Sequence, residues 1–97
     1  MATLAPIHPG EVLLEEYLLP LGLSQAALAR SLGVPAARIH DLVRGRRGLN
    51  GDLALRLAAH FETSPEFWMN LQSHYELESA RDRLGGAIDG SGRVDRS

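Results

Sequence analysis

The segment from Ser24 to Gly45 reads SQAALARSLGVPAARIHDLVRG and constrains the fold more than any other part of the chain. Its apolar residues recur with helical spacing on both sides of Gly33, and a glycine at such a place ends one helix and turns the chain into the next. Ser24 suits the N-cap of the first of these two helices. Two short helices joined by a tight, glycine-containing turn form the sequence pattern of a helix-turn-helix unit.

Helical spacing also covers most of the remaining chain, and no alternating run of apolar residues indicates a strand. We predict a first helix that Pro9 and Gly10 open and that Pro20 and Gly22 end. Asn50 and Ser64 are suitable N-caps for two further helices, the last of which extends to about Leu84. The sequence therefore predicts an all-α, five-helix domain.

The length of 97 residues allows one small domain with a single core. We predict an N-terminal arm over residues 1–7, the helix-turn-helix domain over residues 8–84, and a disordered, glycine-rich tail over residues 85–97. The chain has no cysteine, which excludes disulfides and thiolate chemistry. No apolar run approaches the roughly 20 residues of a membrane span, so we expect a cytoplasmic protein without a membrane partner.

The net charge of −2 is unevenly distributed. Residues 30–56 contain six arginines and two aspartates, a net charge of +4, whereas the rest has four arginines and ten acidic residues, a net charge of −6. A basic segment within an acidic protein favours a polyanionic partner on one face. A chance cluster of arginines is the alternative.

The third predicted helix turns a polar face away from its apolar residues. Arg38 is long enough to reach a guanine edge, and Asp41 suits either a cytosine or an ion pair with Arg38 or Arg44. Ala37, at the centre of this face, would bring the backbone close to a groove, with its methyl near a thymine methyl. An ordinary solvated face is the alternative, but the turn at Gly33 and the basic loop over residues 45–48, which contains Arg46 and Arg47, favour DNA binding. The residues predicted to contact DNA are Gln25, Ala37, Arg38, His40, Asp41, Arg44, Arg46 and Arg47.

The last predicted helix carries two apolar lines. Phe67, Trp68, Leu71 and Tyr75 lie together and are expected in the core. A weaker line on the opposite side predicts a homodimer interface, with scattered surface apolar residues as the alternative. The residues of this predicted interface are Met69, Ser73, Leu77, Ala80 and Leu84.

The sequence contains no arrangement typical of an enzyme. The four histidines are widely spaced and lack an HExxH pattern, so we expect no metal site. No nucleophile, acid and base converge by spacing, and no glycine-rich phosphate loop follows a strand. We therefore expect no catalytic residues and no cofactor.

Three stretches carry a resemblance to a known family: HPGEVLLEEYLLPLGLSQAALARSLGVP, RIHDLVRGRRGLNGDLALRLAAHF and TSPEFWMNLQSHYELESAR. Together they cover about residues 8–81 and resemble the XRE (lambda-repressor-like) helix-turn-helix proteins, and among them the HigA-type antitoxins. The resemblance implies a homodimer that binds double-stranded operator DNA, represses its own operon and neutralises an RNase toxin of the HigB/RelE type. It places base reading on Ala36, Ala37, Arg38, His40 and Asp41, and backbone contacts on Gln25, Arg44, Arg46 and Arg47.

Two points remain open in the sequence. Relatives often carry polar or basic residues where this chain has Ala36 and Ala37, so the operator sequence is not predicted. The acidic residues Glu11, Glu15 and Glu16 suit a basic toxin, but a solvated helix face explains them equally well. A stand-alone regulator without a toxin and a pure protein-interaction module are the alternative functions.

Overall fold

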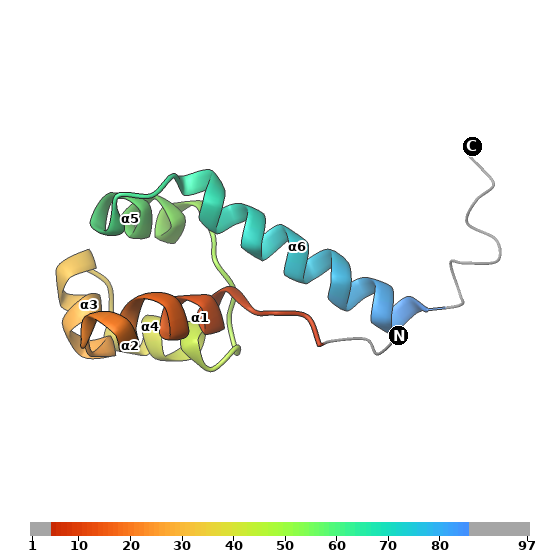
Figure 1. Ribbon diagram of the computed structural model, residues 1–97, viewed down its shortest axis with the longest axis horizontal. Coiled ribbons are helices and arrows are strands. Elements are labelled where there is room, and N and C mark those ends of the chain that lie inside the picture. The colour runs from red at the N-terminus through yellow and green to blue at the C-terminus, as the bar shows by residue number, and fades with distance from the viewer. Residues whose placement is uncertain (1–4, 86–97) are drawn as a thin grey trace.

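The computed structural model describes residues 5–85, and every regular element in that range is a helix (Figure 1). The first helix consists of α1 (Pro9–Val12), a π-helical segment η1 (Leu13–Leu18) and α2 (Leu19–Leu21), which follow one another without a break. The other helices are α3 (Gln25–Leu32), α4 (Ala36–Val43), α5 (Gly51–Phe61) and α6 (Pro65–Leu84). The all-α, five-helix prediction is confirmed for this range. Residues 1–4 of the predicted arm and residues 86–97 of the predicted tail lie outside it.

Side-chain caps fix where the helices begin. Ser24 Oγ, Asn50 Oδ1 and Ser64 Oγ accept backbone N–H groups in the first turns of α3, α5 and α6 at 3.0, 2.9 and 3.0 Å. All three predicted caps are thereby confirmed. The cap of the first helix was not predicted: His8 Nδ1 accepts the N–H of Gly10 at 2.9 Å.

Pro20 explains why the middle of the first helix is π-helical. It has no N–H, and in a regular α-helix its ring would press against the carbonyl four residues earlier. Ahead of it the hydrogen bonds span one more residue, and the N–H of Leu19 bonds to the carbonyl of Leu14. Pro20 was predicted to end the helix, which is wrong, because the wider hydrogen bonds accommodate its ring and the helix continues to Leu21. It ends at Gly22, whose φ of 64° is left-handed and favours glycine.

The core is centred on Trp68, which is 0% exposed. Its Nε1 donates to Thr63 Oγ1 at 2.8 Å, so the polar atom of the buried indole is satisfied. Its ring lies 5.2 Å from that of Tyr17, which brings the first helix against α6. The other buried apolar residues are Leu13, Leu18, Leu28, Ala29, Leu32, Ile39, Leu42, Leu49, Leu53, Ala54, Leu57 and Ala58.

Of the four residues of α6 expected in the core, Trp68 is buried and Leu71 packs against the core. The expectation is wrong for Tyr75 and for Phe67. The side chain of Phe67 remains 37% exposed and meets Trp68 edge-on, with the ring centroids 5.1 Å apart. Tyr75 is half-buried and packs its ring on His8, at 4.7 Å. Phe67 precedes Trp68 on α6, and because Trp68 points into the core, the side chain of Phe67 lies at the edge of the core.

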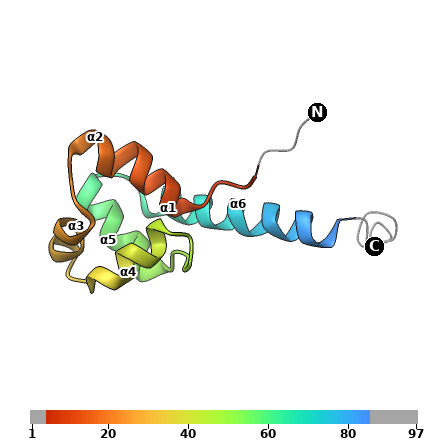
Figure 2. The same cartoon turned by 90° about the horizontal axis from the view of Figure 1, so that it is seen from below.

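The helices divide into two groups around this core (Figures 1 and 2). Helix α5 and the start of α6 lie on one side, and the first helix, α3 and α4 lie on the other. Helix α6 then runs past the other helices, so its C-terminal half stands clear of them. Among the described residues no single helix is long and apolar enough to cross a membrane. Only the bent pair Pro9–Leu21 and Gln25–Leu32 has that length and composition, and its helices meet at 101°.

Candidate nucleic-acid interface

The turn between α3 and α4 has the geometry that the sequence predicted. Gly33 ends α3 with a left-handed φ of 74°, and the N–H of Val34 bonds to the carbonyl of Ala29 at 3.0 Å. Pro35, in extended conformation, leads directly into α4. Ala29 is 2% exposed, and its small side chain lets the two helices pack closely. The helix-turn-helix unit is thus formed by α3 and α4.

Arg56 of α5 stabilises the helix-turn-helix unit by a hydrogen bond to the end of α3. Its Nη1 donates to the carbonyl of Leu32 at the end of α3, at 2.7 Å, and its Nε pairs with Asp52 at 3.0 Å. The sequence analysis counted Arg56 only as part of the basic segment. Its structural partner is 24 positions away in the chain, so no local pattern could have revealed the contact.

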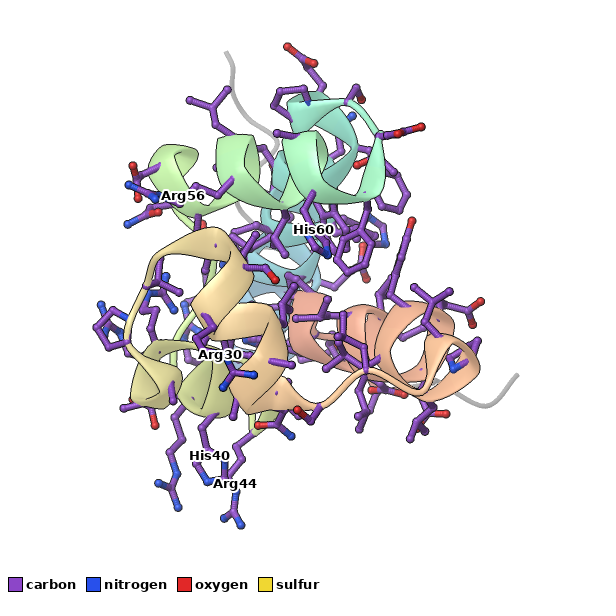
Figure 3. All side chains as sticks on the ribbon, turned by 90° about the vertical axis from the view of Figure 1, so that its left-hand side faces the viewer. Arg30, His40, Arg44, Arg56 and His60 are labelled. Atoms are coloured by element: carbon purple, nitrogen blue, oxygen red, sulfur yellow. The ribbon has the colours of Figure 1, made fainter. Side chains whose placement is uncertain are left out.

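The side of α4 that faces away from the core is accessible to solvent. Ala36, Ala37, His40 and Arg44 are all exposed. His40 and Arg44 extend from α4 at one end of the molecule with Arg30 of α3 nearby, whereas Arg56 and His60 lie on α5, toward the opposite side (Figure 3). This end of the molecule therefore presents cationic and small side chains together.

Gln25 at the start of α3 belongs to the same surface. Its Oε1 lies 3.2 Å from His40 Nδ1, so the two helices exchange a hydrogen bond at their exposed edge. Beside this bond lies a shallow hollow of about 330 Å³, which opens between α3 and α4. Its lining residues are Gln25, Ala26, Ala36, Ala37 and His40.

The loop after α4 holds two arginines out toward solvent. Gly45 turns the chain with a left-handed φ of 76°. The carbonyl of Asp41 then accepts the N–H groups of Arg46 and Arg47 at 2.8 and 3.3 Å. Because their backbones are fixed and their side chains are exposed, both arginines are well placed to contact phosphate oxygens.

Arg38 does not extend from this surface as the sequence analysis expected. It is half-buried, and its Nη2 donates to the carbonyl of Gly48 at 2.7 Å. Its Nη1 is buried and has no hydrogen-bond partner among the described residues. Burial, together with nearby Arg47, lowers the pKa of Arg38, against the opposing effect of Asp41. In this structure the guanidinium group supports the basic loop.

Asp41 is half-buried beside this loop. The sequence analysis considered an ion pair between its carboxylate and Arg38 or Arg44. Within residues 5–85 the ion pairs join Arg56 to Asp52 and Arg81 to Glu78, so that expectation is wrong for this structure. The contribution of Asp41 to the loop comes from its main-chain carbonyl.

Gln72 supports the same loop from α6. It is 7% exposed, its Oε1 accepts the N–H of Leu49 at 2.8 Å, and its Nε2 donates to Glu76 at 2.7 Å. A Cβ added at Gly48 would lie 2.5 Å from Gln72 Oε1, so a larger residue there would make the Gln72 amide move away from its bond to Leu49. Sequence reasoning missed Gln72 because a polar residue within an amphipathic helix looks like a surface residue.

The predicted dimer interface falls on the projecting part of α6, with one correction. Leu77 and Leu84 are 53% and 41% exposed, and Ser73 is exposed as well. Ala80 is half-buried and lines a hollow of about 650 Å³ along the helix. Met69, in contrast, is half-buried and packs against the core, so it belongs mainly to the domain interior.

The chain is similar to several helix-turn-helix proteins. The family described as helix-turn-helix matches residues 14–68. Virulence-associated protein I of Dichelobacter nodosus is 50% identical over 74 residues, which are 76% of this chain and 68% of that protein.

Two solved structures share the fold and much of the sequence. The Pseudomonas aeruginosa antitoxin HigA with the higBA promoter has a TM-score of 0.83 and 51% identity, covering 86% of this chain and 90% of that one. Antitoxin GraA in complex with its operator has a TM-score of 0.86 and 44% identity, covering 100% and 96%. The chain therefore belongs to the XRE (lambda-repressor-like) helix-turn-helix family and, within it, to the HigA-type antitoxins.

Proposed function

We propose that this protein is an antitoxin that binds operator DNA as a dimer, represses its own operon and neutralises an RNase toxin of the HigB/RelE type. The observation that carries the DNA-binding part is the surface of α3, α4 and the following loop, where His40, Arg44, Arg46 and Arg47 are exposed together. Two relatives of the same fold are named as antitoxins with promoter or operator DNA.

The proposed contacts divide into two kinds. Arg44, Arg46 and Arg47 bind phosphates and set the position of the protein on the duplex. Ala37 and His40 lie on α4, the second helix of the helix-turn-helix unit, which enters the major groove in this class of protein. Gln25, at the start of α3, contacts a phosphate. Arg38 and Asp41 act indirectly, because their hydrogen bonds fix the loop that carries Arg46 and Arg47.

DNA binding is tested with the duplex upstream of the protein's own reading frame, by fluorescence anisotropy over a range of salt concentrations. Arg46→Ala is expected to weaken binding to this duplex and to random DNA alike, and to reduce the salt slope by about 1. Arg81→Ala, on α6 and paired with Glu78, is the matched control and should change neither. Binding that is too weak to measure, or that ignores salt, would contradict the proposal.

We propose that the projecting half of α6 forms the homodimer interface through Leu77, Ala80 and Leu84. An isolated helix with exposed leucines gains stability by burying them against a second copy. Such a dimer would place two α4 helices on half-sites about 34 Å apart. Leu77→Glu should yield monomers in light scattering, whereas Leu55→Glu, on α5 and 60% exposed, should not. A dimer that survives Leu77→Glu would rule out this interface.

The toxin contact is proposed for the acidic face of the first helix. Glu11, Glu15 and Glu16 are all exposed there and complement a basic RNase. The test is co-purification with the product of the adjacent reading frame, followed by a neutralisation assay with the triple substitution of these glutamates by lysine. If the adjacent frame encodes no RNase and nothing co-purifies, the protein is a stand-alone regulator of the same fold.

A further inference from the structure

The hollow between α3 and α4 differs in character from the surface around it. Ala26, Ala36 and Ala37 contribute only methyl groups to its lining, and the polar groups of Gln25 and His40 bond to each other at 3.2 Å. Arg30 and Arg44, which lie near His40 at this end of the molecule (Figure 3), are exposed cations. The surface thus offers an apolar recess of about 330 Å³ within a positively charged rim.

A DNA duplex can fill such a recess with only one kind of group. In the major groove the base edges present hydrogen-bond donors and acceptors, and the single apolar group among them is the 5-methyl of thymine. The charged rim is complementary to the phosphates on either side of the groove. A guanine or cytosine edge in the same place would lose its hydrogen bonds to water without gaining a partner from the alanines.

We propose that this recess is a specificity subsite for the 5-methyl group of a thymine in the operator. Ala37 and Ala26 form its two walls, on α4 and α3, and the Gln25–His40 bond fixes the distance between the walls. The inference rests on the proposed DNA-binding function. It adds that Ala36 and Ala37 of α4, where relatives often carry polar or basic residues, favour thymine at one position of the operator. Because their side chains are short, these alanines leave room for the methyl group in the recess.

The test begins with a duplex that the full-length protein selects from a randomised pool, so that no operator has to be assumed. Each thymine of one half-site is then replaced by deoxyuridine, which removes only the methyl group. At one thymine, or at two neighbouring ones, the affinity should fall about fourfold, the value expected from burying one methyl group. The other replacements should have little effect.

The site is assigned with protein variants. Ala37→Leu fills the recess, so the thymine and deoxyuridine duplexes should bind this variant equally. Ala26→Ser adds one hydroxyl to the opposite wall and should likewise reduce the preference for the methyl group. This smaller variant keeps the test valid if the leucine of Ala37→Leu prevents the protein from entering the major groove. Ala59→Leu, an exposed alanine on α5, is the control and should keep the full fourfold difference. Circular dichroism and thermal melting confirm that each variant is folded.

Three results would overturn the proposal in distinguishable ways. If the duplex binds but no thymine is sensitive to loss of its methyl, the recess is not a subsite, and DNA binding stands. If one thymine is sensitive but remains equally so in Ala37→Leu and Ala26→Ser, the methyl group is recognised elsewhere. If no duplex is selected at all, the DNA-binding function fails and the subsite with it.

Discussion

Gln72 Oε1 accepts the backbone N–H of Leu49 at 2.8 Å, and this bond ties α6 to the end of the basic loop. Gln72→Leu keeps the size of the side chain but leaves the N–H of Leu49 without a partner in a buried place. The free energy of unfolding should fall by about 1–3 kcal/mol. Chemical denaturation measures this loss. Asn70→Leu, on the exposed side of α6, is the control and should change stability by less than about 0.5 kcal/mol.

Arg38 provides a test of how DNA is contacted. Arg38 was predicted to read a base, whereas in the structure its guanidinium donates to the carbonyl of Gly48. If it supports the loop, Arg38→Ala should weaken binding to specific and random duplexes by equal factors. The substitution should also lower the free energy of unfolding by about 1–2 kcal/mol. A loss confined to the specific duplex would instead restore the base-reading role.

Gly10 packs against α4 without room for a side chain. A Cβ added there would lie 1.8 Å from the carbonyl oxygen of Leu42, so the start of the first helix would have to move. We expect Gly10→Ala to destabilise the protein by about 2–3 kcal/mol in thermal or chemical unfolding. Gly51→Ala is the matched control, since a Cβ at Gly51 meets nothing within 4 Å. It should be neutral or stabilising by about 0.5 kcal/mol. Equal effects of the two substitutions would contradict the close contact.

His8 makes stability depend on pH. Burial lowers its pKa below the ordinary 6.5, with nearby Glu11 opposing the shift. The neutral ring accepts the N–H of Gly10, and a protonated Nδ1 cannot. Because the unfolded chain binds this proton more readily, the contribution of His8 is complete above pH 6.5 and is lost as the pH falls through the lower folded pKa.

The measurement for His8 is the melting temperature between about pH 7.5 and about pH 5. It should fall in the wild type. His8→Asn keeps a capping side chain that does not titrate in this range, so its melting temperature should fall less. Parallel curves for the two proteins would show that other groups set the pH dependence.

Features that depend on neighbouring residues were predictable from the sequence. Ser24, Asn50 and Ser64 cap the helices they were assigned to, because a cap acts on a backbone N–H three positions away. Leu53 and Leu57 of α5 are four positions apart and are both buried, as helical spacing of apolar residues predicts.

Features that depend on distant contacts were not predictable. The Arg38–Gly48 bond needs the path of the loop, and the bond from Gln72 crosses 23 positions of the chain. Gly10 stands at the start of a helix, where glycine is ordinary, and only the close packing of α4 against it explains why no side chain fits there. At the candidate site the structure brings most of the predicted residues to one exposed surface, whereas the guanidinium of Arg38 is half-buried beneath it.

Trp68 is the chain's only tryptophan and provides an intrinsic fluorophore. Its indole is enclosed by Tyr17 from the first helix, Phe61 from α5 and Phe67 from its own helix. Its emission in the folded protein should therefore be that of an apolar environment, and should shift to longer wavelength when these helices separate. Because this fluorophore is intrinsic and buried, its signal follows unfolding without a label on the proposed DNA-binding surface.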